Sequence, residues 1–308
     1  MADKIVVIGS LNMDLVGCAP RIPVVGETIV GHKYFSEPGG KGANQAYAAA
    51  TLGGRVAMLG RVGSDEFGRE MRLNLEKVGC DVSGLAAIEG ATSGIALIFV
   101  ADSGQNSIII VPGANDMFSP ADVDAAQEFL KNAALVLLQL ENPLPTVLAA
   151  ARAAQRAGAR VILDPAPAQP VPEELFAICD VITPNETEAA ILTGLPPSSL
   201  NPEQAVEIAR KLQARNAKTV IVKLGEQGCM LVEGGKPQLV PAPKVKAVDT
   251  TAAGDVFNAG LAVALSEGLE LAAACKFANR AASLSVTKLG TQVATPSRAE
   301  VDAFAINA

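Results

Sequence analysis

Short runs rich in Val, Ile and Leu alternate along the chain with longer segments whose apolar residues recur at helical spacing. The short runs predict strands at residues 5–8, 56–59, 135–138, 161–163, 181–183 and 219–222. The longer segments predict helices at residues 44–52, 66–78, 121–130, 146–157 and 203–214. The repeated order of strand and helix predicts an α/β fold, in which a mostly parallel central sheet is flanked by helices.

Two regions, residues 15–37 and 92–112, show an extended pattern punctuated by turns, with no long helical segment between their expected strands. We expect these insertions to form a small β-sheet beside the strand ends where α/β proteins bind ligands, and so to act as a lid. Residues 1–308 would then form one α/β domain that carries this lid.

Composition argues against a nucleic-acid-binding protein, a membrane protein and a disulfide or zinc framework. The formal net charge of -7 argues against nonspecific binding of nucleic acid, which needs a basic surface. Nothing before Ile5 resembles a signal peptide and no apolar run approaches the roughly 18 residues of a membrane span, so we expect a cytoplasmic protein with no membrane partner. The five cysteines are scattered and lack C-x-x-C spacing, which favours buried free thiols over disulfides or a zinc site.

The segment Asp249-Thr250-Thr251-Ala252-Ala253-Gly254-Asp255 precedes an apolar helical pattern over residues 256–265. At the start of that helix, the backbone N–H groups of Ala252, Ala253 and Gly254 would form an anion hole that a phosphate can approach closely. Asp255 at its edge could take a proton from a hydroxyl that attacks the phosphate, so the segment indicates phosphoryl transfer. An ordinary capping acid at a helix start explains the same residues, and this alternative stays open.

Several other signatures are missing. The segment 39–42 lacks the spacing of a Walker loop and has no Ser or Thr after Lys41, and the first strand is not followed by G-x-G-x-x-G. His32 is the only histidine, which excludes a histidine-based triad or metal cluster within one chain, and we expect it to be a polar lid residue.

Three segments together resemble the ribokinase-like sugar kinases, in the family's order: residues 39–46 (GGKGANQA), 185–188 (NETE) and 249–255 (DTTAAGD). Residues 9–14 (GSLNMD) and 164–168 (DPAPA) extend the resemblance over nearly the whole chain. It implies a Rossmann-type three-layer α/β fold and ATP-dependent phosphorylation of the primary hydroxyl of a sugar. The GGKGANQ form is most similar to members that convert D-ribose to ribose 5-phosphate and ADP. A kinase of another sugar or nucleoside, and a sugar-responsive binding protein without turnover, remain alternatives.

The resemblance also implies roles for individual residues. Asp255 would be the catalytic base and would also contact the sugar, together with Asn12, Asp14, Gly40, Lys41, Asn44 and Glu141. These side chains offer the donors and acceptors that a polyhydroxylated ligand requires, and glycine allows close approach of the backbone. ATP would contact Asn185, Lys223, Gly225, Gly228, Gly254 and Asn279, although relatives often carry His at the position of Asn279.

Two cations follow from the same resemblance. Asn185 and Glu188 would support Mg²⁺ bound to ATP, mainly through water, because hard oxygen ligands suit this ion. The same pair also fits an ordinary helix N-cap with Glu at the third position, and both readings can hold. Potassium would be bound, mainly by backbone carbonyls, at Asp249, Thr251, Ser285, Lys288, Gly290 and Ala294.

The expected lid also predicts a homodimer. A sheet of about four strands is too thin to bury two faces, so the apolar alternation around Ile95, Leu97 and Phe99 needs a partner surface. Two lids that pair across a two-fold axis would provide it, as in ribokinase-like enzymes.

Overall fold

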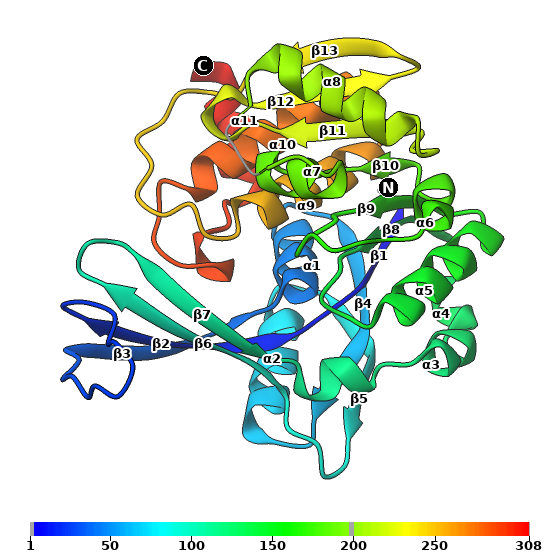
Figure 1. The fold of residues 1–308 in the computed structure, drawn as a ribbon. Helices are drawn as coiled ribbons and strands as arrows, with labels where there is room; N and C mark the ends of the chain where they lie inside the picture. The colour runs from blue at the N-terminus through cyan, green and yellow to red at the C-terminus, as the bar shows by residue number, and fades with distance from the viewer. Residues whose placement is uncertain (1–2, 197–199, 308) are drawn as a thin grey trace.

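Alternate residues of strand β1 (Lys4–Ile8) point to opposite faces of a nine-stranded sheet. Ile5 and Val7 belong to the hydrophobic core on one face, and Val6 and Ile8 belong to the core on the other. A strand buried on both faces needs this continuous apolar run. The computed structural model describes residues 3–196 and 200–307, and Figure 1 shows their arrangement.

The larger sheet has the order β13-β12-β11-β10-β9-β8-β1-β4-β5, and its strands from β11 to β5 are parallel. β12 and β13 add an antiparallel edge. Besides β1, the strands are β4 (Arg55–Gly63), β5 (Asp81–Ile88), β8 (Ala133–Leu138), β9 (Arg160–Leu163), β10 (Val181–Ile182), β11 (Thr219–Lys223), β12 (Cys229–Glu233) and β13 (Lys236–Val240).

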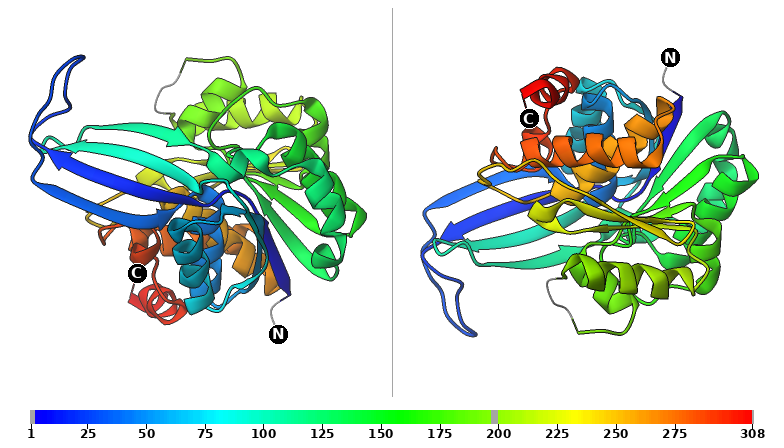
Figure 2. Two further views of the ribbon diagram at one scale, coloured as in Figure 1. Left: turned by 90° about the horizontal axis from the view of Figure 1, so that it is seen from below. Right: turned by 90° about the horizontal axis from the view of Figure 1, so that it is seen from above.

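Helices cover both faces of this sheet, which makes three layers (Figures 1 and 2). One face packs against α1 (Lys41–Thr51), α2 (Glu66–Lys77), α9 (Ala253–Ser266), α10 (Leu271–Ser285) and α11 (Arg298–Asn307). The other packs against α3 (Pro120–Ala125), α4 (Gln127–Leu130), α5 (Leu144–Arg156), α6 (Glu173–Ile178), α7 (Glu186–Leu192) and α8 (Pro202–Gln213). Short 3₁₀ helices are η1 (Gly113–Met117), η2 (Gly225–Gln227) and η3 (Gln292–Ala294). None of the helices in the described ranges is both long and apolar enough to cross a membrane.

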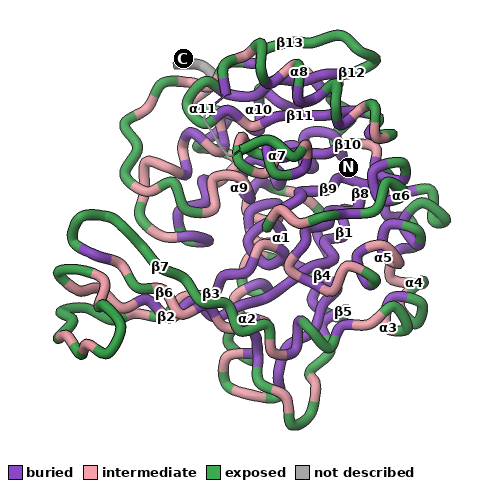
Figure 3. The backbone as a smooth tube through the Cα atoms, viewed as in Figure 1, coloured by how far each residue is buried: buried purple, intermediate pink, exposed green. Residues whose placement is uncertain are grey.

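A separate four-stranded sheet projects from this body (Figure 2). Its order is β3-β2-β6-β7, with bounds β2 (Asn12–Ala19), β3 (Lys33–Gly39), β6 (Gly94–Ala101) and β7 (Asn106–Val111). Its strands come from the two regions that the sequence singles out, and much of its surface is exposed (Figure 3). Strand β2 starts at Asn12 rather than at residue 15, so Asn12 and Asp14 are part of the small sheet.

The expected strands and helices are found, with one error. The helix predicted for residues 121–130 is two short helices, α3 and α4, which meet at Ala126. Ser119 caps α3 through a reciprocal pair of hydrogen bonds with Asp122, so that helix begins one residue before the predicted start, at Pro120.

Candidate active site

Asp255 lies in the first turn of α9 and is buried, with 5% of its surface exposed. Both of its carboxylate oxygens accept hydrogen bonds from α1. Asn44 Nδ2 donates to Oδ2 at 3.1 Å, and Gln45 Nε2 donates to Oδ1 at 3.0 Å. Two donors on opposite oxygens fix the plane of the carboxylate and leave its remaining lone pairs for a third partner.

Burial raises the pKa of Asp255 to about 6, and the nearby Asp164 carboxylate acts in the same direction. The Lys41 ammonium and the amides of Gln45 and Asn44 work against this rise. The group is therefore ionised at neutral pH but more basic than an exposed aspartate. These properties suit a general base.

The start of α9 is a sharp turn. Ala252, the residue that precedes the helix, has φ 57°, in the left-handed region that non-glycine residues seldom adopt. The N–H of Ala253 makes a long hydrogen bond of 3.3 Å to the Thr250 carbonyl. A Cβ placed on Gly254 would lie 3.3 Å from Lys223 Nζ, so an ammonium lies beside the positive end of the helix. Together they favour an anion at this point.

The small sheet contributes Asn12 and Asp14, and Asp14 is near enough to Asp255 for the two charges to interact. A Cβ on Gly39 would come within 2.3 Å of Asp14 Oδ2, so only glycine lets β3 pass this closely to the carboxylate. Burial, with the charges of Glu37 and Glu141, raises the pKa of Asp14 to about 7. Asp14 is thus a buried carboxyl that gains from a ligand able to donate hydrogen bonds to it.

Lys41 and Glu141 lie between the small sheet and α9. Glu141 Oε2 accepts hydrogen bonds from the backbone N–H of Lys41 at 3.0 Å and from Ser10 Oγ at 2.5 Å. Gly40, which precedes Lys41, has φ 86°, and a Cβ there would lie 2.6 Å from the backbone nitrogen of Asn12. Burial opposes a charge on Lys41, but the carboxylates of Asp255, Asp164 and Glu141 outweigh it and raise the pKa of Lys41 above its ordinary value.

A cleft of about 960 Å³ opens beside Asp255. Its walls include the start of α9, the start of α7 and the turn between β11 and β12. The residues for which the sequence predicts contacts with ATP or Mg²⁺ all line this cleft: Asn185, Glu188, Lys223, Gly225, Gly228, Gly254 and Asn279. Lys41 and Asp255 also line it, so the cleft reaches the side chains near the small sheet.

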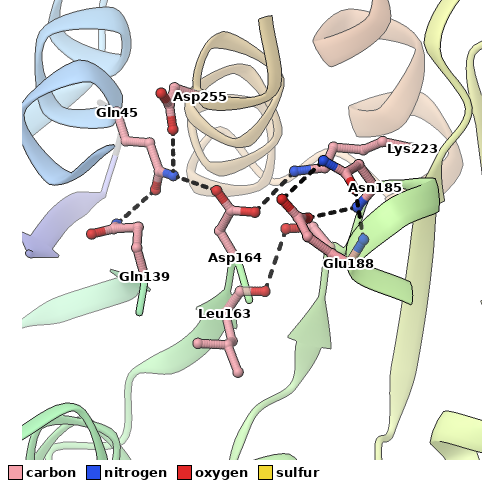
Figure 4. A network of polar contacts seen from close by, with 9 residues as sticks. Gln45, Gln139, Leu163, Asp164, Asn185, Glu188, Lys223 and Asp255 are labelled. Carbon is pink, nitrogen blue, oxygen red and sulfur yellow. Dashed lines mark hydrogen bonds and ion pairs between the residues drawn. The ribbon is translucent and has the colours of Figure 1, made fainter. Parts of the chain in front are cut away.

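Two polar pairs lie on the cleft wall (Figure 4). Lys223 Nζ lies 2.9 Å from Asp164 Oδ1, and both side chains are nearly buried. Asn185 and Glu188 form the capping box of α7, in which the Asn185 side chain accepts from the Glu188 N–H and Glu188 accepts from the Asn185 N–H. The capping interpretation of this pair is therefore correct, and both residues also line the cleft. Burial raises the pKa of Glu188.

Two glycines shape the turn between β11 and β12. Gly225 and Gly228 have φ values of 53° and 97°, and a Cβ on Gly228 would meet the Val240 carbonyl at 2.2 Å. Asn279 Nδ2 donates to this same carbonyl at 2.8 Å. The Asn279 amide thus holds the chain after β13 in place, a structural contact that the sequence did not predict.

Hydrogen bonds connect some of the residues expected at a potassium site, which belong to the segment before α9, the end of α10 and the segment after α10. Asp249 Oδ1 accepts from the Thr251 N–H at 2.9 Å, and Oδ2 accepts from the Gly290 N–H at 3.1 Å. The Lys288 N–H donates to the Ser285 carbonyl at 3.1 Å, and the Lys288 ammonium pairs with Glu300 at 2.8 Å, so the Lys288 side chain is not a cation ligand. Ala294 ends η3 close by in the sequence. Burial works against ionisation of Asp249, but hydrogen bonds from Thr251 and Gly290 outweigh it and lower its pKa.

Sequence reasoning did not assign roles to four buried residues of the site, Gln45, Asn115, Gln139 and Asp164. Gln45 bonds to two carboxylates, and Asn115 donates to Asn12 Oδ1 at 2.9 Å. Asp164 directly follows a predicted strand, at the edge where ligands bind in α/β proteins, and this position could have identified it. The glutamines carry no comparable signal, because only the fold shows what they contact.

Comparison with known proteins places the chain in a family. The profile described as "pfkB family carbohydrate kinase" matches residues 2–298. The chain belongs to the pfkB family of carbohydrate kinases. It is 40% identical to the ribokinase of Haemophilus influenzae over 304 residues, which cover 99% of each chain. A deoxyribokinase of Salmonella typhi is also 40% identical, over 95% of each chain.

Solved structures agree with this membership of the pfkB family. The structure of Arabidopsis thaliana ribokinase complexed with ribose and ATP has a TM-score of 0.92 with this chain, at 38% identity, and 98% of each chain is covered. The expectation of a carbohydrate kinase with a ribokinase-like α/β fold is therefore confirmed. The roles of the individual residues remain predictions.

Proposed function

We propose that the chain transfers the γ-phosphoryl group of ATP to the primary hydroxyl of D-ribose, giving ribose 5-phosphate and ADP, in the cytoplasm. The observation that carries the proposal is the place of Asp255, at the anion-attracting start of α9 and at the end of the cleft. The side chains of Asn12, Asp14, Lys41 and Asn44 and the Gly40 backbone would bind the sugar on one side, with Glu141 as a further acceptor. ATP would occupy the cleft on the other.

In the reaction, Asp255 takes the proton of the sugar hydroxyl as its oxygen forms a bond to the γ-phosphorus. The bond from that phosphorus to the bridging oxygen of ADP breaks, and ADP leaves with the electron pair. The backbone N–H groups of Ala252 to Gly254 would stabilise charge that develops on the phosphoryl oxygens. Lys41, which stays protonated among the carboxylates, would add a positive charge between the two substrates.

The residues present fit the two cations that the family resemblance implies. Asn185 and Glu188 offer hard oxygen atoms at the cleft wall and would hold Mg²⁺ mainly through water. When bound, this ion neutralises the triphosphate. K⁺ would be bound, mainly through backbone carbonyls, at Asp249, Thr251, Ser285, Lys288, Gly290 and Ala294. Hydrogen bonds from Thr251 and Gly290 keep Asp249 anionic there. When bound, that ion orders the loop before the anion hole.

We further propose that the small sheet is a lid and a dimer interface. All six residues of β7 are exposed, and Ile108, Ile109 and Ile110 give this edge an apolar surface. Such a surface favours a second copy of the sheet, which would cover it across a two-fold axis. The same sheet carries Asn12 and Asp14, so its closure over the sugar would exclude water from the reaction.

A coupled assay of ADP release tests the proposed function. D-Ribose, 2-deoxy-D-ribose, D-fructose and adenosine are each supplied with MgATP, and kcat/KM is measured for every acceptor. We expect D-ribose to give the highest value. A higher value for 2-deoxy-D-ribose would assign the chain to the deoxyribokinases, and preference for adenosine would assign it to the nucleoside kinases. Ribose binding without turnover of any acceptor would indicate a binding protein.

A further inference from the structure

A chain of buried amides leads away from Asp255 on the side opposite the cleft (Figure 4). Gln45 Nε2 donates to Asp255 Oδ1 at 3.0 Å and to Asp164 Oδ2 at 2.9 Å. The oxygen of the same amide, Gln45 Oε1, accepts from Gln139 Nε2 at 2.8 Å. Gln45 and Gln139 are at most 1% exposed, so water does not compete for these bonds.

A second amide chain reaches the other oxygen of Asp255. Asn44 Nδ2 donates to Asp255 Oδ2, and Asn44 Oδ1 accepts from Gln292 Nε2 at 3.0 Å. Gln292 Oε1 in turn accepts from Asn74 Nδ2 at 2.6 Å. Gln292 belongs to η3, which lies beyond the loop that carries Gly290, and it is 3% exposed.

The direction of both chains follows from the chemistry of the carboxylates. An ionised aspartate only accepts, so the Gln45 and Asn44 amides must turn their N–H groups toward Asp255. Their oxygens must then face away from it, toward Gln139 and Gln292. Gln139 and Gln292 bond to these oxygens, so without them each inner amide is held only through its N–H group and is freer to tilt away from Asp255.

We infer that Gln139 and Gln292 are positioning residues that hold the Asp255 carboxylate in the orientation in which it accepts the substrate proton. Neither residue lines the cleft, so each acts through another amide. The inference rests on the proposed function, because it takes Asp255 to be the base. It assigns a role to Gln139 and Gln292, two residues that no sequence motif or charge marks as part of the site.

The pH dependence of turnover gives this inference a specific readout. Hydrogen bonds from Gln45 and Asn44 stabilise the ionised form of Asp255, and the Lys41 ammonium does the same. The carboxylates of Asp164 and Asp14 lie near enough to oppose it. Loss of an orienting glutamine leaves Lys41, Asp164 and Asp14 in place and weakens one hydrogen bond. The acid limb of kcat/KM should therefore move to higher pH.

The test compares Gln139→Met and Gln292→Met with the parent enzyme, because Met keeps the length of the side chain without its hydrogen bonds. We expect each change to lower kcat about tenfold, the scale of one buried hydrogen bond, with little change in the KM for ATP. The acid limb should move upward in both. Gln213→Met is the matched control. Gln213, the last residue of α8, also donates through Nε2, to the carbonyls of Lys218 and Val232. Its kinetics should equal those of the parent.

A double-variant cycle separates positioning from general damage to the fold. In an Asp255→Asn background the base is already lost, so Gln139→Met should cause almost no further loss of turnover. An equal tenfold loss in both backgrounds would overturn the inference, as would parental kinetics in both single Met variants. If Gln139→Met does not fold, Gln292→Met is taken through the same cycle. Parental turnover in Asp255→Asn alone would instead refute the proposed base, so the two failures are distinguishable.

Discussion

The ammonium of Lys223 lies 2.9 Å from Asp164 Oδ1, and the two side chains are only 11% and 3% exposed. The second oxygen of Asp164 accepts from Gln45, which also bonds to Asp255. Asp164 therefore connects a lysine on the cleft wall to the proposed base. Burial opposes a charge on Lys223, but Asp164 and Glu188 outweigh it and raise its pKa.

Removal of one member of this ion pair should destabilise the protein. Lys223→Met leaves the Asp164 charge buried without its partner, and we expect the free energy of unfolding in urea to fall by about 3 kcal/mol. Lys211→Met, which breaks the exposed pair with Glu207, is the control and should cost less than about 0.5 kcal/mol. Equal unfolding midpoints for the two variants would show that the buried ion pair contributes no more to stability than the exposed pair.

Asp14 should make the ligand-free protein less stable as pH rises. The folded state raises its pKa from 3.8 to about 7, so its stabilising contribution is complete below 3.8 and is lost as the pH rises through about 7. Asp14→Asn removes this titration. The free energy of unfolding of the variant minus that of the parent should therefore be up to about 4 kcal/mol more favourable to the variant at pH 8 than at pH 4, because each pKa unit corresponds to about 1.4 kcal/mol. Urea unfolding at the two pH values measures the gain. A difference in the free energy of unfolding between variant and parent that does not change with pH would contradict the raised pKa of Asp14.

Potassium should activate the enzyme through the loop of Asp249 and Gly290. We expect turnover and the affinity for ATP to fall when K⁺ is replaced by tetramethylammonium, because the loop before the anion hole loses its support. Gly290 has φ 100°, and a Cβ there would lie 2.7 Å from Val293 Cγ2, so Gly290→Ala should reduce the activation. Identical rates with the two cations would argue against the site.

The apolar edge of the small sheet should hold a dimer together. Ile109 is 57% exposed, and Ile109→Lys should give a monomeric mass by light scattering and a higher KM for the sugar. Leu73→Lys, at a leucine on α2 that is 48% exposed, should leave the mass unchanged. A parent protein that is monomeric with and without ribose would refute the proposed dimer.

Many of the strands and helices could be predicted from the sequence, including the parallel strands β1, β4, β8 and β9 and the lid segments. Helices α6, α10 and α11 were not predicted. The hairpin of β12 and β13 was missed, because β13 is short, carries Pro237 and buries only Val240. Strand β5 was missed for a related reason, since it buries only Val82 and Leu85.

The site could be predicted only where its residues stand close together in the sequence. The segment 249–255 shows a helix start followed by an acid, and the structure has both. What it cannot show is that Gln45 and Asn44, 210 and 211 positions earlier, donate to that acid. Such contacts arise from the packing of α1 against α9, which depends on the whole sheet.

The turnover of Asp255→Asn, with D-ribose and MgATP at saturating concentrations, shows whether Asp255 is the base. Asn keeps the shape of the side chain but cannot accept the proton. We expect a folded variant that binds ATP as the parent does and loses about 10²- to 10⁴-fold in kcat, the usual scale for a general base. A variant that keeps more than half of the parental kcat would show that Asp255 is not the base.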